Sequence, residues 1–104
     1  MVLNIFNQLF ERHPEQRKAQ VEIYTWQLCP YCIRARMLLL WKGAQFTEYK
    51  IDGDSAARAK MAERANGKRS VPQIFINDRH IGGCDELYRL DSQGQLNALL
   101  RETP

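Results

Sequence analysis

Cys29-Pro30-Tyr31-Cys32 stands between a stretch that favours a strand and a stretch that favours a helix. The upstream stretch, Val21-Glu22-Ile23-Tyr24-Thr25-Trp26, is rich in β-branched and aromatic residues. The downstream stretch runs from Ile33 to Trp41 and is ended by Gly43. Two cysteines three positions apart at a strand-to-helix turn can close a reversible disulfide. The region therefore predicts redox chemistry carried on a βα unit.

The two cysteines are expected to have different roles. Pro30 falls at the first helical position, where its missing N–H costs nothing and its fixed φ suits the helix. Cys29 is then close to the N-cap, and its sulfur faces unpaired backbone N–H groups and the positive end of the helix dipole, which favour the thiolate. Cys29 is the expected nucleophile. Cys32, one turn on, is near enough to attack a mixed disulfide formed at Cys29.

Two structural explanations of the cysteine pair are weaker. A bridge across so short a loop would remove little entropy from the unfolded chain, and a cytosolic chain would keep the pair reduced. Structural zinc needs four ligands, and beyond the pair the chain offers only Cys84, His13 and His80. We therefore expect no metal site.

The composition fits one small domain. A chain of 104 residues, 44% of them hydrophobic, can bury one core. Three cysteines leave one unpaired after the active pair forms, which favours a reducing compartment, and we expect the cytoplasm. No apolar run approaches the ~20 residues that span a bilayer. The net charge of +3 is scattered without the basic stripe of a nucleic-acid interface, so neither nucleic acid nor a membrane is an expected partner.

Residues 1–20 are expected to form an N-terminal extension, and residues 21–104 the domain. Between Val2 and Phe10 the apolar positions 2, 3, 5, 6, 9 and 10 fit one side of a short helix. Residues 11–20 are polar, are interrupted by Pro14 and read as a linker. The extension lacks the basic start and longer apolar core of a signal peptide. A short helix packed on the domain, or a frayed terminus, is favoured over a membrane-surface or partner-binding helix.

From residue 21 onward, expected strands and helices alternate. The strands are 21–26, 45–51, 73–76 and 79–81, and the helices follow the cysteine motif to 41 and then cover 56–65, 85–90 and 96–101. A helical crossover makes the first two strands parallel, and the tight turn Asn77-Asp78 makes the last two a hairpin. The predicted fold class is therefore α/β, a mixed four-stranded sheet flanked by helices.

Polar residues and glycines mark the expected helix ends. Asp52-Gly53-Asp54-Ser55 supplies turn and N-cap residues for the second helix, and Asn66-Gly67 closes it. Asp85 is expected to cap the third helix. Ser92 and Gln95 are expected to form a capping box for the last one.

Four separated motifs, in order, make residues 21 to about 101 resemble a dithiol glutaredoxin of the CPYC type. They are Cys29-Pro30-Tyr31-Cys32, Ile51-Asp52-Gly53, Ser70-Val71-Pro72-Gln73-Ile74-Phe75-Ile76 and Gly82-Gly83-Cys84-Asp85-Glu86-Leu87. Thioredoxins usually carry Trp-Cys-Gly-Pro-Cys and lack the Gly-Gly-Cys-Asp segment. The resemblance implies the thioredoxin fold, glutathione-dependent thiol–disulfide exchange and a cis peptide bond before Pro72.

The resemblance also implies a glutathione site. Glutathione is an extended tripeptide with a carboxylate at each end and an ammonium group at the γ-glutamyl end. Val71, just before Pro72, can pair its backbone with the ligand cysteine as a strand edge would. Asp85 can take the ammonium, while the N–H groups of Cys84 and Asp85 can hold the neighbouring carboxylate.

Four further positions have roles that the sequence leaves open. Gly82 and Gly83 either permit close backbone approach to the ligand or are ordinary turn glycines. Tyr31 either covers the thiol and contacts partner proteins or packs at the helix start. Cys84 is expected to act through its backbone rather than as a second redox sulfur.

The cation for the glycine carboxylate of glutathione is less well defined. Many members of the family have a lysine three residues before the first cysteine, where this chain has Trp26. Arg58 is the first expected substitute, with Lys60 and Arg69 behind it. Each of these residues is otherwise an ordinary solvated cation.

The expected mechanism begins when the Cys29 thiolate attacks the glutathione sulfur of a mixed disulfide and releases the reduced substrate. A second glutathione then frees Cys29. For protein disulfides, Cys32 resolves the intermediate, and glutathione reopens the Cys29–Cys32 bridge. The expected partners are glutathione, glutathionylated or disulfide-containing proteins and, indirectly, an NADPH-dependent glutathione reductase. We expect a monomer that serves electron transport and cell redox homeostasis.

Other functions stay open at this point. The runner-up is an iron–sulfur cluster carrier, in which two chains share a cluster through Cys29 and two glutathiones, although Pro30 is common in forms that hold clusters poorly. A carrier served by a thioredoxin reductase is disfavoured by the Gly-Gly-Cys-Asp segment. The intact cysteine pair argues against a non-catalytic binding module.

Overall fold

The computed structural model describes residues 18–104, and the expected helix within residues 2–10 lies outside the described part. The elements are β1 (Val21–Thr25), α2 (Pro30–Trp41), β2 (Phe46–Lys50), α3 (Ser55–Arg64), β3 (Gln73–Ile76), β4 (Arg79–Gly82), α4 (Cys84–Ser92) and α5 (Leu96–Arg101). The predicted order from residue 21 onward is confirmed. None of the helices in residues 18–104 has the length and apolar character needed to cross a membrane.

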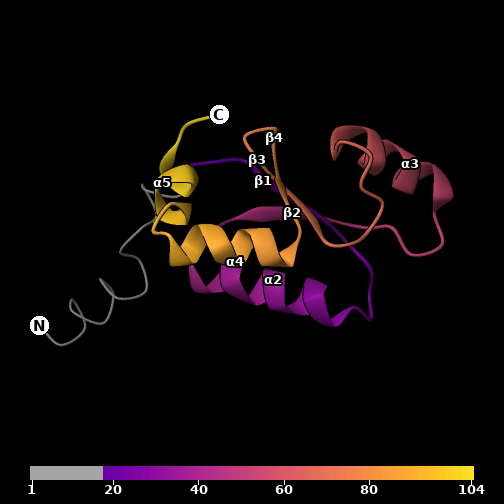
Figure 1. Ribbon diagram of the computed structural model, residues 1–104, viewed down its shortest axis with the longest axis horizontal. Coiled ribbons are helices and arrows are strands. Elements are labelled where there is room, and N and C mark those ends of the chain that lie inside the picture. Colours follow the sequence, from indigo (N-terminus) through magenta and orange to yellow (C-terminus); the bar gives the residue numbers. More distant parts are fainter. Residues whose placement is uncertain (1–17) are drawn as a thin grey trace, which may run out of the picture.

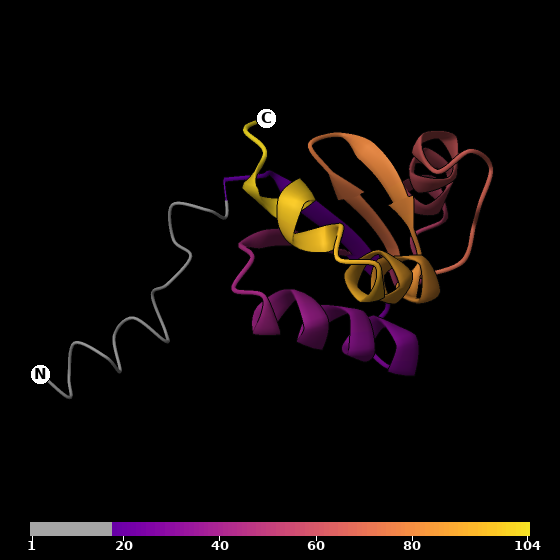
Figure 2. The same ribbon diagram turned by 60° about the vertical axis from the view of Figure 1, so that its left-hand side comes forward.

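The strands form one mixed four-stranded sheet in the order β2-β1-β3-β4. β1 pairs with β2 in parallel and with β3 antiparallel, and β3 and β4 form an antiparallel hairpin. Asn77 and Asp78 at the hairpin turn have φ values of 51° and 68°, the left-handed region that a tight hairpin needs. Figures 1 and 2 show α2 and α4 side by side on one face of the sheet and α3 on the other. This is the thioredoxin fold.

The main core lies between the sheet and the α2–α4 layer. Alternate residues of each strand point into it, among them Val21 and Ile23 of β1 and Ile74 of β3. Leu39 of α2 and Leu87 of α4 are fully buried against them. Burying each leucine side chain stabilises the fold by roughly 1.5–3 kcal/mol. This packing fixes the start of α2, which carries the cysteine pair, against the sheet.

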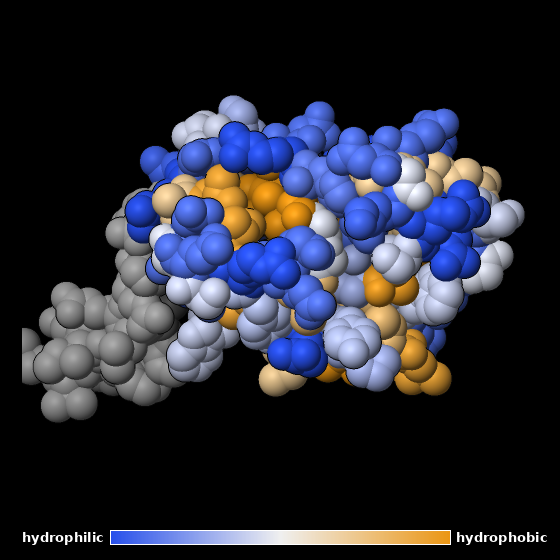
Figure 3. Space-filling model, in the orientation of Figure 1, coloured by the Kyte–Doolittle hydropathy of each residue, from blue (hydrophilic) through white to orange (hydrophobic). Residues whose placement is uncertain are grey.

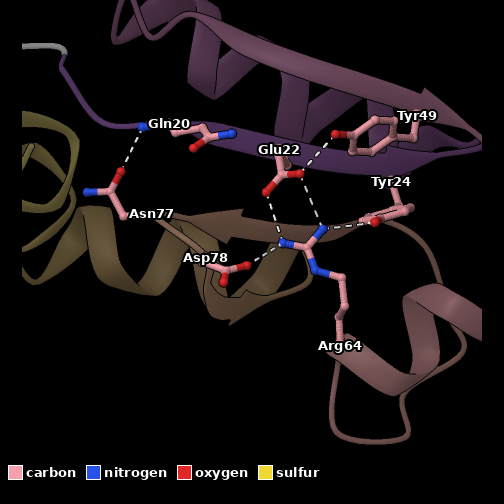
Figure 4. Close-up of polar contacts among 7 residues, drawn as sticks. All are labelled: Gln20, Glu22, Tyr24, Tyr49, Arg64, Asn77 and Asp78. Carbon is pink, nitrogen blue, oxygen red and sulfur yellow. Dashed lines mark hydrogen bonds and ion pairs between the residues drawn. The ribbon is translucent and has the colours of Figure 1, made fainter. Parts of the chain in front are cut away.

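The opposite face of the sheet is held to α3 by one arginine, as Figure 4 shows. The Arg64 guanidinium donates to Glu22 Oε1 at 2.9 Å and to the Tyr24 hydroxyl at 2.9 Å. It also pairs with Asp78 at 2.9 Å and lies 4.1 Å from the ring centroid of Phe75. Two strands, β1 and β3, and the β3–β4 turn are thereby tied to the end of α3.

The helix caps agree with the prediction at α3 and differ at α4 and α5, although α5 begins at Leu96 as predicted. Asp54 caps α3, and its Oδ1 accepts from the Ala57 N–H at 3.0 Å. The prediction that Asp85 caps the next helix is wrong, because the chain turns at Gly82 with φ +120° and the N-cap is Gly83. The capping box at Ser92 is also wrong. That hydroxyl donates to the Arg89 carbonyl inside α4 at 2.9 Å, since α4 runs on through Ser92.

Candidate active site

Cys29 is the N-cap of α2, as predicted. Its backbone is extended, and its carbonyl accepts from the Ile33 N–H at 3.0 Å. The Cys32 N–H donates to Cys29 Sγ at 3.3 Å. Pro30 occupies the first turn. The sulfur therefore sits where a backbone donor and the helix dipole both stabilise negative charge.

The two thiols of the pair differ in burial. Cys29 is 9% exposed, whereas Cys32 is fully buried. Burial raises the pKa of the Cys32 thiol to about 12, and the neighbouring Cys29 sulfur adds to this effect. Cys29 is thus the thiol that solvent and substrate can reach. The raised pKa favours the protonated thiol at Cys32.

The loop before β3 faces the start of α2. The Val71–Pro72 peptide bond is cis, as the resemblance implied, and the Val71 carbonyl oxygen lies 3.9 Å from Cys29 Sγ. A groove of about 260 Å³ opens beside them. It is lined by Tyr31, Ser70, Val71, Pro72, Gly83, Cys84, Asp85 and Glu86. The structure therefore brings together six of the nine predicted site residues in one groove next to Cys29.

The N-terminus of α4 forms the far side of this groove. Cys84 and Asp85 are its first residues, and backbone N–H groups in a first helical turn have no partner within the helix. Asp85 is exposed, so its carboxylate is free to meet a cation. A Cβ added to Gly83 would lie 3.2 Å from the Pro72 carbonyl oxygen. Gly83 thus lets α4 approach the Pro72 loop closely.

Cys84 lines the groove but is a poor nucleophile. It is 4% exposed, and burial raises the pKa of its thiol. The Arg34 guanidinium opposes this rise in pKa, and Asp85, Cys29 and Glu86 each add a smaller contribution that raises it. The geometry fits the expected role of Cys84 through its backbone.

Glu86 was missed by the sequence analysis. Its Oε1 accepts from the Gly83 N–H at 2.7 Å, and this bond lowers the pKa of the Glu86 carboxyl. The side chain thus supplies the cap that Gly83 cannot. The three-residue spacing from Gly83 to Glu86 is half of a capping box and could have indicated the contact.

Gln73 and His80 hold the loop before β3 in place through hydrogen bonds. The sequence did not indicate this positioning role. The buried Gln73 donates through Nε2 to the Ser70 carbonyl at 3.1 Å. Its Oε1 lies 2.7 Å from His80 Nε2, and His80 Nδ1 lies 3.2 Å from the Asn66 amide nitrogen. Burial lowers the pKa of His80, which favours the neutral ring that this chain of bonds requires.

Arg58 does not line the groove. Its guanidinium lies 4.9 Å from the Trp26 ring centroid, and its Nε donates to the Arg69 carbonyl at 2.9 Å. Arg69 precedes the groove residue Ser70, so this cation stands beside one end of the groove. Lys60 and Arg69 are exposed. The role of all three toward a carboxylate stays a prediction.

The glutaredoxin family model matches residues 21–81, more than half of the chain. The chain belongs to the glutaredoxin family. A probable glutaredoxin of Synechocystis is 62% identical over 104 residues, covering 97% of this chain and 95% of the relative. Glutaredoxin 3 of Escherichia coli is 55% identical over 83 residues, covering 80% of this chain and 99% of the relative.

Solved glutaredoxins have the same fold. The solution structure from Brucella melitensis is 47% identical with a TM-score of 0.72, covering 82% of this chain and 91% of that one. A buckwheat glutaredoxin–glutathione complex is 25% identical with a TM-score of 0.73, covering 96% of this chain and 93% of that one. This glutaredoxin is a glutathione-dependent thiol–disulfide oxidoreductase, and Cys29 and Cys32 form its dithiol motif.

Proposed function

We propose that the protein reduces glutathione mixed disulfides through Cys29 alone and protein disulfides through the Cys29–Cys32 pair. The observation that carries this proposal is the contrast among the three thiols. Cys29 caps a helix beside an open groove, whereas burial raises the pKa of both Cys32 and Cys84. Within the described domain, Cys29 is therefore the thiol placed to attack a disulfide in the groove.

The proposed exchange has two steps. The Cys29 thiolate attacks the glutathione sulfur of a mixed disulfide, a new Cys29–glutathione S–S bond forms, and the substrate thiolate leaves. Glutathione thiolate then attacks that bond, which forms oxidised glutathione and restores Cys29. With a protein disulfide, the Cys29 thiolate attacks one sulfur, forms a Cys29–substrate disulfide and releases the first substrate thiolate. Cys32 then attacks the Cys29 sulfur, its proton passes to the second substrate sulfur as that sulfur leaves, and the Cys29–Cys32 bridge forms. Two glutathiones then reopen the bridge.

We propose that glutathione lies in the groove. The Val71 backbone, next to Pro72, would pair with the cysteine of glutathione. The N–H groups of Cys84 and Asp85 would hold the γ-glutamyl carboxylate, and the Asp85 carboxylate would hold the ammonium. The groove beside Cys29 and the glutathione complex of the buckwheat relative support this placement. Tyr31 would cover the sulfur.

We propose Arg58 as the cation for the glycine carboxylate. Its position over Trp26 and beside the Arg69 carbonyl supports this role, because both contacts pre-order a long side chain at one end of the groove. Three cysteines leave one unpaired when Cys29 and Cys32 are bridged, and this odd count fits a reducing compartment. We therefore propose a cytoplasmic monomer that passes electrons from glutathione, recycled by glutathione reductase, to protein partners.

A coupled assay tests the function. The full chain is mixed with a small glutathione mixed disulfide, glutathione, glutathione reductase and NADPH, and NADPH oxidation is followed. We expect turnover in this mixture and little when thioredoxin reductase replaces glutathione and its reductase. Equal or faster turnover with thioredoxin reductase would contradict the proposal. An absorption spectrum of protein purified without oxygen would reveal a bound iron–sulfur cluster if the alternative function applied.

A further inference from the structure

The core of the domain is open at one edge. A hollow of about 550 Å³ lies between β4, α4 and α5, and shares only Glu86 with the groove beside Cys29. Ile81, Leu90 and Leu99 line it, and these side chains pack on the core but are only partly buried. Figure 3 shows an apolar hollow with a polar rim at this place.

The described chain begins beside this hollow. The Ala19 N–H donates to the Leu100 carbonyl in α5 at 3.1 Å. The Gln20 N–H donates to Asn77 Oδ1 at 2.7 Å, and the Asn77 N–H donates back to the Gln20 carbonyl at 2.8 Å. Residues 18–20 are thus held between α5, which lines the hollow, and the turn that leads into β4, which also lines it. Residues 11–17 can extend about 25 Å, so residues 2–10 can reach any part of it.

The chemistry of residues 2–10 matches the hollow. The segment Val2 to Phe10 contains no charged side chain, and its apolar positions share one side of a helix. Docking there would bury apolar surface and would bring no charge from the segment into the hollow, whose polar rim includes Arg79, Glu86 and Arg89. The competing apolar surface is the outer face of α2, where Met37 and Trp41 are exposed. That face is the convex surface of a helix, where a docked side chain would be contacted on one side. A side chain inserted into the hollow would be contacted on several sides.

We propose that residues 2–10 dock as an amphipathic helix in the hollow of the same chain, with Phe6 or Phe10 inserted between Ile81, Leu90 and Leu99. The docked segment closes the open edge of the core. It does so away from Cys29, and the inference is independent of the proposed function.

Nuclear Overhauser effects in the full chain test the docking. We expect cross-peaks from the Phe6 or Phe10 ring protons to the methyl groups of Ile81, Leu90 and Leu99. They should persist on dilution and be absent between chains in a mixture of differently labelled protein. Cross-peaks between chains would mean docking on a second copy, and cross-peaks to Met37 would mean docking on α2. Either result, or no cross-peak at all, would overturn the proposal.

A matched pair of full-length variants provides a second readout. Ala98 and Asn97 are neighbouring exposed residues of α5, but only Ala98 lines the hollow. Ala98→Asp should place a charge against the docked side and raise the rate of chymotrypsin cleavage after Phe6 and Phe10 severalfold. Asn97→Asp should leave that rate unchanged. Equal cleavage rates in the two variants and the unmodified chain, with circular dichroism unchanged, would show that the segment is not docked there. Vesicle binding by the unmodified chain that protects the same bonds would instead assign the segment to a lipid surface.

Discussion

Cys29 and Cys32 show how a single helical turn separates two chemically identical side chains. Cys29 Sγ accepts a hydrogen bond from the Cys32 N–H at the N-cap of α2, where negative charge on the sulfur is stabilised. Cys32 lies inside the helix, where burial raises the pKa of its thiol to about 12. The proposed roles of Cys29 as nucleophile and Cys32 as resolving thiol therefore rest on position in the helix, which Pro30 already indicated in the sequence.

We expect the negative charge of the Asp85 carboxylate to favour glutathione over thiols that lack a γ-glutamyl ammonium group. Asp85→Asn keeps the shape of the side chain but removes the charge proposed to hold the γ-glutamyl ammonium. Losing this charge-assisted contact should lower kcat/KM for glutathione roughly tenfold to a hundredfold. Steady-state rates with varied glutathione measure the change.

Two controls make the Asp85 prediction specific. Reduction of the Cys29–Cys32 bridge by a small dithiol, which lacks the γ-glutamyl group, should change far less in the same variant. Glu63→Gln, which removes an exposed charge on α3, should leave both rates unchanged. Equal losses with glutathione and the dithiol would mean that Asp85 supports the fold or the thiolate rather than glutathione.

Among the elements, α3 depends most on one side chain. Arg64→Met should destabilise the protein by about 3 kcal/mol, because it leaves the mostly buried Glu22 carboxylate without its partner. Urea unfolding measures the loss. Lys60→Met, which removes an exposed cation from the same helix, should have little effect. A loss as large from Lys60→Met would mean that net charge, and not the ion pair, holds α3.

The loss of stability in Arg64→Met should depend on pH, because it involves the ionised carboxylate of Glu22. Its hydrogen bond with Arg64 lowers its pKa in the folded protein, so the stabilisation is fully present above the unfolded value of about 4.3 and is lost as the pH falls through the folded pKa. The stability gap between the unmodified protein and Arg64→Met should therefore narrow from about pH 5 to pH 3. A gap independent of pH would mean that packing on Phe75 carries the effect.

The elements also show what sequence patterns can and cannot reveal. The strand predicted from residue 21 and the helix cap predicted within residues 52–55 depend on neighbours in the chain, and β1 and the Asp54 cap confirm both predictions. The Arg64–Glu22 pair joins residues 42 positions apart, so no local pattern predicts it. The start of α4 was misjudged because the turn at Gly82 moves the helix start ahead of Asp85. In the site, most groove residues could be predicted because they belong to the sequence motifs. The roles of Glu86 and Gln73 depend on contacts that only the folded chain shows.

For the whole molecule, the catalytic unit should not need residues 1–17. The deletion must stop there, because the N–H groups of Ala19 and Gln20 bond to Leu100 and Asn77. Turnover with glutathione should stay within about twofold of the full chain, since every groove residue lies at or beyond Tyr31. The melting temperature should fall, because the deletion also removes the proposed cover of the hollow. A large loss of turnover without loss of folding would mean that the extension reaches the active site.

The central claim is that Cys29 alone carries the exchange with glutathione mixed disulfides. The most direct measurement is the rate of glutathione-dependent reduction of a small glutathione mixed disulfide by Cys29→Ser and by Cys32→Ser. The account predicts no turnover for Cys29→Ser, because burial keeps Cys32 and Cys84 as thiols. It predicts retained turnover for Cys32→Ser, because glutathione itself resolves the Cys29 intermediate. Comparable losses in the two variants on this substrate would contradict the account.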